Sequence, residues 1–219
     1  MLTNNIKFNN FSVKSKNLHL NKIFKNLKIN YLKGQIKFLL SFSKNYKYSY
    51  SKKLVHKYKN FFNFRVIGMG GSILGAKAIF QFLNHKIKKN FFFIDNLQNR
   101  IDLKKNKKSF VNLIISKSGN TLETISNVNI LIKKNNKNIF IIENKNNYLN
   151  NLANQIKAEI VEHKNYIGGR YSVLSEVGML PAELMGLKEK EFKRLNYLIS
   201  NKSFINQLIQ NVASTLSLV

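Results

Sequence analysis

Four residues that suit anion binding stand close together in the middle of the chain: Ser116, Lys117, Ser118 and Thr121. They follow an apolar run and precede a stretch with helical spacing. The N-terminus of a helix has unpaired backbone N–H groups and a partial positive charge, and hydroxyl side chains supply further donors. This combination suits a phosphate group. We call residues 116–121 the hydroxyl loop and consider it a candidate phosphate-binding site.

Helix capping is the alternative explanation of the same segment. Asn120 would cap the following helix, and Glu123, three residues later, would complete a capping box. Capping accounts for these two residues without any ligand. It does not explain why two serines and a lysine cluster before the cap, so phosphate binding is the favoured hypothesis.

A glycine-rich turn, residues 68–75, lies between another apolar run and another helical stretch. Glycine lets the backbone approach a ligand closely and adopt positive φ. The turn lacks the G-x-G-x-x-G spacing of a dinucleotide site, because Ile73 stands where the third glycine is required. A sugar or phosphate site is the favoured interpretation of this glycine turn. A tight turn that binds nothing is the alternative.

A third segment, residues 168–181, contains Arg170, one of only four arginines in the chain. The guanidinium is a planar cation with five N–H donors, which suits a delocalised oxyanion. The alternative for this arginine segment is a loop that ends at a helix with Pro181 in its first turn.

The elements that must position these segments alternate between β-rich runs and helical stretches from residue 61 onward. The predicted strands are 64–68, 91–94, 111–115, 138–142 and 159–161, and the predicted helices among them are 72–83, 122–132 and 148–155. Apolar strands separated by helices predict an α/β fold, in which helices cover both faces of a parallel sheet. The glycine turn and the hydroxyl loop follow the first and third strands. Both therefore fall at the carboxyl edge of the sheet, where ligands bind.

The rest of the chain is predicted to be helical or irregular. We expect an extended arm over residues 1–18, one or two helices over 20–42, a surface helix over 43–60, a weak helix or loop over 101–107, and helices over 178–187, 189–199 and 203–216. The predicted domains are an N-terminal arm with helices (1–60), an α/β domain (61–163), and a loop with connecting helices (164–219).

The formal net charge of +27 suggests an anionic partner, but the basic residues are mostly scattered lysines. Arginine, which reads phosphates and bases through its fork, is scarce, so no nucleic-acid partner is predicted. Cysteine is absent and the histidines and carboxylates form no ligand cluster, so neither a metal nor another cofactor is expected. No run reaches the roughly 18 apolar residues of a membrane span, and the N-terminus lacks a signal core. We expect a cytoplasmic protein with no membrane partner.

Together, the three segments resemble motifs of the phosphoglucose isomerase (glucose-6-phosphate isomerase) family. Residues 68–75 resemble its Gly-Gly-Ser turn, and residues 116–124 resemble its Ser-Lys-Thr phosphate loop, which ends in Glu-Thr. Residues 168–181, with Gly186, resemble its GGR-[FY]-S…GxLP signature. The resemblance implies a SIS-type, flavodoxin-like three-layer fold that binds sugar phosphates.

The resemblance also implies roles for single residues. Ser116, Lys117 (through its backbone), Ser118 and Thr121 would hold the sugar phosphate, Gly71 and Ser72 would line the sugar, and Arg170 would stabilise the enediolate. The implied reaction interconverts glucose 6-phosphate and fructose 6-phosphate in glycolysis and gluconeogenesis, without a cofactor. The full-length form would be a homodimer.

The sequence departs from the family in two ways. Ser118 replaces the usual threonine, and Ser-Gly-Asn-Thr resembles the dual phosphoglucose/phosphomannose isomerase branch. Nothing after Pro181 resembles the family's base glutamate or ring-opening histidine, so we expect an N-terminal portion that is inactive alone. The alternatives are a dual isomerase and a non-catalytic regulatory module that binds phosphosugars.

Overall fold

The structure is a computed structural model that describes residues 18–97, 109–134, 137–196, 198 and 201–216. The chain divides into two compact units, one of them Phe38–Glu189, the other Met1–Lys37 with Lys190–Val219. The weak helix or loop expected at 101–107, and almost all of the arm expected at 1–18, lie outside the described residues.

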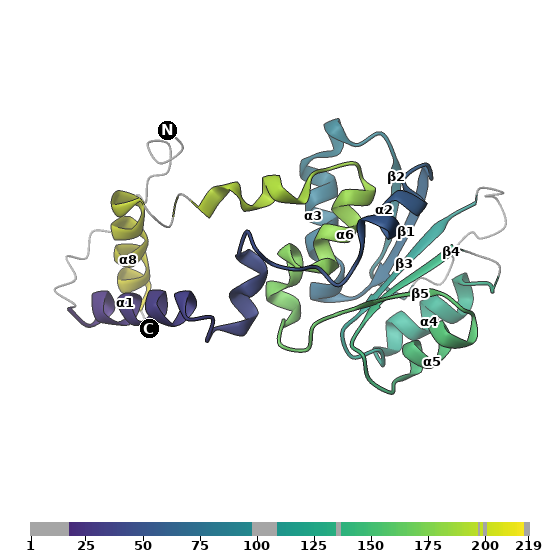
Figure 1. The fold of residues 1–219 in the computed structure, drawn as a ribbon, viewed down its shortest axis with the longest axis horizontal. Helices are drawn as coiled ribbons and strands as arrows, with labels where there is room; N and C mark the ends of the chain where they lie inside the picture. The colour runs from purple at the N-terminus through teal and green to yellow at the C-terminus, as the bar shows by residue number, and fades with distance from the viewer. Residues whose placement is uncertain (1–17, 98–108, 135–136, 197, 199–200, 217–219) are drawn as a thin grey trace. The chain divides into compact units, whose positions relative to one another are not determined.

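The Phe38–Glu189 unit is built on a five-stranded parallel sheet (Figure 1). Its strands are β1 (Asn63–Gly68), β2 (Asn90–Ile94), β3 (Val111–Ser116), β4 (Lys137–Ile142) and β5 (Glu159–Glu162), in the order β2-β1-β3-β4-β5. The α/β prediction is confirmed, because each predicted strand agrees with the structure to within one residue at either end. The strand order reverses between β1 and β3, and such a reversal opens a crevice at the carboxyl edge.

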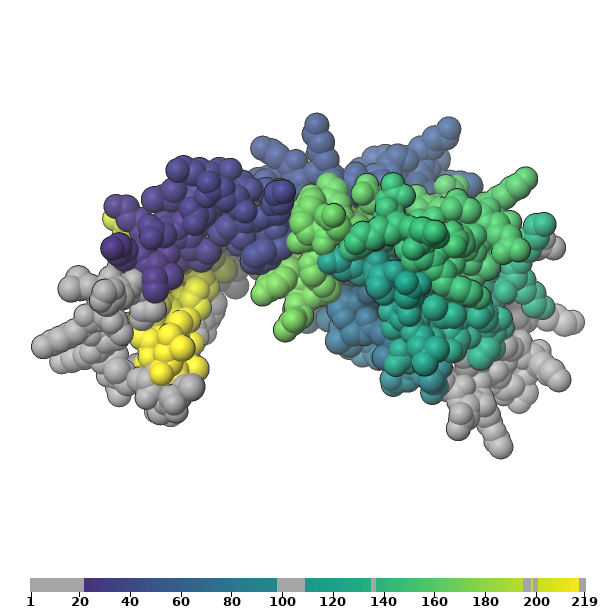
Figure 2. All heavy atoms as spheres, turned by 90° about the horizontal axis from the view of Figure 1, so that it is seen from below, coloured from purple at the N-terminus to yellow at the C-terminus, as the bar shows by residue number. Residues whose placement is uncertain are grey.

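Helices cover both faces of this sheet, as predicted. Figure 1 shows α3 (Leu74–Phe82) and α6 (Glu176–Leu184) on one face, and α4 (Leu122–Leu131) and α5 (Tyr148–Gln155) on the other. A short helix, α2 (Lys52–Tyr58), contacts α6. In the space-filling view of Figure 2, the bright green later part of the unit lies directly against its blue and teal earlier part.

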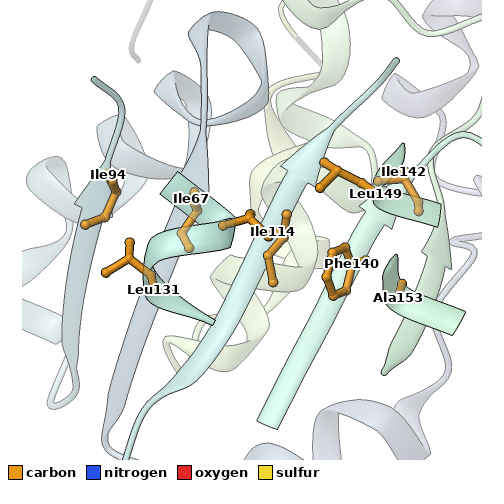
Figure 3. Close-up of a cluster of buried hydrophobic side chains, with 9 residues drawn as sticks. Ile67, Ile94, Ile114, Leu131, Phe140, Ile142, Leu149 and Ala153 are labelled. Atoms are coloured by element: carbon orange, nitrogen blue, oxygen red, sulfur yellow. The ribbon is translucent and has the colours of Figure 1, made fainter. Parts of the chain in front are cut away.

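The core lies where the central strands meet α4 and α5. Figure 3 shows Ile67, Ile114 and Phe140 of the sheet beside Leu131 and Leu149 of these helices. All five side chains are buried, and each contributes about 1.5–3 kcal/mol to stability. The continuous apolar runs of the sequence are thus explained by burial on both faces of the sheet.

Several helix predictions differ from the structure. The 3-10 segments are η2 (Lys37–Phe42), η3 (Gly70–Ser72), η4 (Asn84–Lys86), η5 (Gly169–Leu174) and η6 (Glu189–Asn196). The helix predicted at 72–83 therefore begins at Leu74, after the turn of η3, and much of the one predicted at 189–199 is the 3-10 segment η6.

The surface helix predicted over 43–60 is wrong for its first half, because only α2 is helical. Two tyrosines before α2 are held by tertiary contacts that a helix would disrupt. The Tyr46 hydroxyl donates to Glu176 and the Tyr50 hydroxyl donates to Glu183, both at 2.8 Å.

In the other unit, α1 (Leu18–Leu32) and α8 (Lys202–Leu216) contact each other. Gly34 adopts a φ of +69° just after α1, which confirms the predicted interruption. Asn201 caps α8, because its Oδ1 accepts the Phe204 N–H at 3.0 Å. Among the described residues, no helix is long and apolar enough to cross a membrane.

Candidate functional site

The glycine turn and the hydroxyl loop leave the sheet side by side. Gly68, the last residue of β1, pairs with Ile115 of β3. A Cβ on Gly68 would lie 2.7 Å from the Ile115 carbonyl oxygen, so only glycine fits this close approach. Both segments thus begin at the crevice where the strand order reverses.

The hydroxyl loop brings its three hydroxyl side chains together around Thr121. Thr121 Oγ1 lies 3.2 Å from Ser116 Oγ and 3.5 Å from Ser118 Oγ. The Asn120 backbone N–H donates to Ser118 Oγ at 3.3 Å. Ser116 is buried, whereas Ser118 is exposed, so the cluster opens toward the surface on one side.

Helix α4 begins at this cluster without a side-chain cap. Its N-cap residue is Thr121, whose side chain makes no capping hydrogen bond. The capping-box alternative is therefore wrong. The Asn120 Oδ1 instead accepts the backbone N–H of Tyr148 at 3.0 Å, on α5. The positive end of α4 thus faces the hydroxyls with no side-chain oxygen on it.

The Lys117 ammonium is engaged elsewhere. Its Nζ donates to the Asn165 carbonyl oxygen at 2.7 Å and lies 3.5 Å from Glu143 Oε1. Burial alone would raise the pKa of the Glu143 carboxyl, but Lys145 and Lys117 outweigh burial and leave that pKa below its usual value. A phosphate contact from Lys117 would therefore come from its backbone N–H.

The glycine turn and the arginine segment pack against each other. A Cβ on Gly71 would lie 2.4 Å from the backbone carbon of Gly169. The Ser172 hydroxyl is placed to donate to both glycine carbonyl oxygens, 3.1 Å from that of Gly71 and 2.8 Å from that of Gly169. Ser72, beside Gly71, is half-buried. These contacts join two segments that the sequence could only treat separately.

Arg170 directly follows Gly169 and is exposed. Its guanidinium makes no hydrogen bond or ion pair to another described residue. It is therefore a cation that begins at the glycine turn and has no protein partner within the described ranges. No described group of His, Asp and Glu residues is arranged to hold a metal ion.

The remainder of the arginine segment corrects a detail of the prediction. Helix α6 begins at Glu176, because Ser175 caps it by accepting the Val177 N–H at 3.3 Å. Pro181 consequently lies inside the helix, not in its first turn. A Cβ on Gly178 would lie 2.1 Å from the Val173 carbonyl oxygen, so this glycine lets η5 and α6 pack closely.

The sequence analysis missed the residues that support the hydroxyl loop from α5, chiefly Asn147 and Tyr148. Asn147 caps α5 and lies against Gly119. An asparagine immediately before a predicted helix was the available signal. His163 is also buried, just after β5, and burial lowers the pKa of its imidazole.

Comparison with known proteins identifies the family. The family model described as phosphoglucose isomerase matches residues 39–213. The chain belongs to the phosphoglucose isomerase family. This assignment agrees with the resemblance of the three segments.

Curated relatives of this family cover most of the chain. A glucose-6-phosphate isomerase of Methanocaldococcus jannaschii is 38% identical over 146 residues, which are 60% of this chain and 35% of that protein. A probable glucose-6-phosphate isomerase of Methanococcus maripaludis is 33% identical over 199 residues, 81% of this chain and 43% of that protein. The chain thus spans less than half the length of these relatives.

Solved structures share the fold. A hypothetical protein of Thermus thermophilus aligns with a TM-score of 0.65 and 21% identity, over 80% of this chain and 45% of that chain. An Escherichia coli protein, solved as a complex with a small ligand, aligns with a TM-score of 0.52 and 20% identity, over 84% of this chain and 98% of that chain. With the family assignment, these alignments confirm the predicted SIS-type α/β fold.

Proposed function

We propose that the Phe38–Glu189 unit binds glucose 6-phosphate and fructose 6-phosphate and supports their interconversion. The observation that carries the proposal is the N-terminus of α4, which has no side-chain cap and lies beside the hydroxyls of Ser116, Ser118 and Thr121. In this proposal these hydroxyls, the Lys117 backbone N–H and the end of α4 hold the phosphate dianion.

Gly71 and Ser72 line the sugar, and Arg170 lies beside the reacting carbons. Isomerisation removes the proton from C2 of the open-chain aldose, and the electron pair forms a C1–C2 double bond. O1 then carries negative charge. Return of a proton to C1, with transfer of the O2 proton to O1, gives the ketose. The exposed Arg170 guanidinium stabilises the charge on the enediolate, and a preorganised donor of this kind contributes about 3–4 kcal/mol.

The role of Arg170 separates an isomerase from a module that only binds phosphosugars. Charge on the enediolate develops after binding, so Arg170→Ala should change the Kd for glucose 6-phosphate by less than about twofold. Loss of most of the binding in this variant would make Arg170 a ground-state ligand. Lys164→Ala, which removes a cation from the same loop outside the proposed site, is the matched control.

Calorimetry on the full 219-residue chain tests the binding proposal. Glucose 6-phosphate and fructose 6-phosphate should bind with micromolar to millimolar Kd, and unphosphorylated glucose should not bind. Mannose 6-phosphate in the same experiment measures the selectivity of the site. A folded sample that binds neither sugar phosphate would contradict the proposal. Sedimentation of the same sample tests the homodimer that the family implies.

A further inference from the structure

The first backbone N–H groups of α5 are all bonded, and two of them bond to the hydroxyl loop. The Tyr148 N–H donates to Asn120 Oδ1 at 3.0 Å, and the Leu149 N–H donates to the Gly119 carbonyl oxygen at 3.1 Å. The next N–H, that of Asn150, donates to Asn147 Oδ1 at 2.9 Å. The end of α5 therefore grips the loop that precedes α4.

The conformation of Gly119 makes this grip possible. Its φ is +67°, in the region that favours glycine, and a Cβ there would lie 1.9 Å from Asn147 Oδ1. Asn147 is itself buried, and its Nδ2 donates to the Lys145 carbonyl oxygen at 3.1 Å. The Asn147 carboxamide is thus fixed in orientation and leaves room for a glycine only.

Asn120 is held at two points. Its side chain bonds to α5, and its backbone N–H donates to Ser118 Oγ, which in turn lies 3.5 Å from Thr121 Oγ1. The hydroxyls that face α4 are therefore connected through Asn120 to a helix outside their own loop. A loop ordered before binding loses less conformational entropy when a ligand arrives, and so binds more tightly.

We infer that Asn120 is a positioning residue: through its bond to Tyr148, it holds the hydroxyl loop in the conformation that binds the sugar phosphate. This role rests on the function proposed above. Asn120 accepts a hydrogen bond from α5 and contributes no group of its own to the phosphate. Its effect on the ligand passes through Ser118 and Thr121.

The test compares Asn120→Ala with Asn201→Ala in the full chain. Both substitutions remove an asparagine oxygen that accepts an N–H near a helix start, on α5 and α8 respectively. Losing such an oxygen typically weakens the local structure about fivefold. Asn120→Ala should raise the Kd for glucose 6-phosphate about fivefold, and should accelerate hydrogen exchange of the Tyr148 amide by a similar factor in the ligand-free protein. Asn201→Ala should change neither.

A conservative variant separates positioning from general damage. Asn120→Asp retains an acceptor oxygen, so it should restore the protection of the Tyr148 amide that Asn120→Ala loses. If the wild type binds, unchanged affinity in a folded Asn120→Ala protein with a deprotected Tyr148 amide would overturn the positioning role and leave the proposed function intact. If the wild type does not bind any sugar phosphate, the proposed function fails, and the positioning role fails with it.

Discussion

Helices α4 and α5 lie on the same face of the sheet and begin beside the same loop, yet their N-termini are occupied differently. At α5, oxygens of Gly119, Asn120 and Asn147 accept the first N–H groups. At α4, the N-cap Thr121 makes no side-chain cap. Since an N-cap typically stabilises a helix by about 1 kcal/mol, α4 forgoes a stabilising contact that α5 has.

The difference indicates how the molecule keeps one helix end ready for an anion. The side-chain amide that local sequence would place on α4, that of Asn120, is turned to α5 instead. The stabilising contact is made, but at the neighbouring helix, and the loop is fixed by it. An α4 end with hydroxyls around it and no cap is the arrangement that a phosphate would complete.

The largest effect is expected at Gly119, where the loop meets α5. Gly119→Ala places a Cβ 1.9 Å from Asn147 Oδ1 at a φ of +67°, so we expect about 2–3 kcal/mol of destabilisation. Gly168→Ala is the matched control, because its Cβ would approach nothing closer than 3.9 Å. Urea unfolding measures both variants. Equal stability of the two would mean that α5 does not constrain the loop.

Thr121 tests the other side of the comparison. Thr121→Val removes a hydroxyl but no cap, so stability should change by less than about 0.5 kcal/mol. The Kd for glucose 6-phosphate should rise at least tenfold, because a hydrogen bond to a charged group contributes about 1.5–3 kcal/mol. Thr215→Val on α8, away from the loop, is the control for calorimetry. A large loss of stability in Thr121→Val would show that its hydroxyl does serve as a cap.

Asn147 is the counterpart of Thr121, since each is the N-cap of its helix. Asn147 does cap α5, so Asn147→Ala should cost about 1 kcal/mol of stability. Its effect on the Kd for glucose 6-phosphate should be smaller than that of Thr121→Val. Thermal unfolding and calorimetry together measure this reversal. If both variants lost stability and affinity equally, the two helix ends would not be different in kind.

The same comparison marks the limit of prediction from sequence. Helix α5 was predicted with its observed bounds, Tyr148–Gln155, because the apolar pattern is local. Asn120 was assigned to the wrong helix, because its partner Tyr148 is 28 residues away and capping rules consider only the adjacent helix. Pro181 was placed in a first turn by a local preference that Ser175, as the actual cap, overrides.

The candidate site shows a similar division. Glycine and hydroxyl residues at strand ends announced the glycine turn and the hydroxyl loop, because parallel topology fixes the edge at which they lie. The packing of Gly71 on Gly169 was not predictable, since no local pattern relates residues so far apart. Nor was the use of the Lys117 ammonium by Asn165 and Glu143, which depends on how three loops meet.

The smallest effect concerns pH and again separates the two sides of the loop. The binding side has neutral hydroxyls, whereas the strand ends near α5 carry the buried groups Glu143 and His163. Burial lowers the pKa of the His163 imidazole, so the unfolded chain takes up its proton at higher pH than the folded chain does. Stability should therefore fall as the pH drops below about 6.5, with a slope of at most about 1.4 kcal/mol per pH unit from this residue.

A matched pair of variants identifies the group responsible. His163→Asn should remove the part of the slope that begins near pH 6.5, whereas His56→Asn, at an exposed position, should not. Glu143 acts at lower pH: its lowered pKa means that the stability it contributes is lost as the pH falls below about 4.3. Urea unfolding between these two ranges distinguishes the residues, and an unchanged slope in His163→Asn would exclude the imidazole as its source. Affinity for glucose 6-phosphate over the same range should follow only the ionisation of the phosphate, with a pKa of about 6, because the groups proposed to hold it do not titrate there.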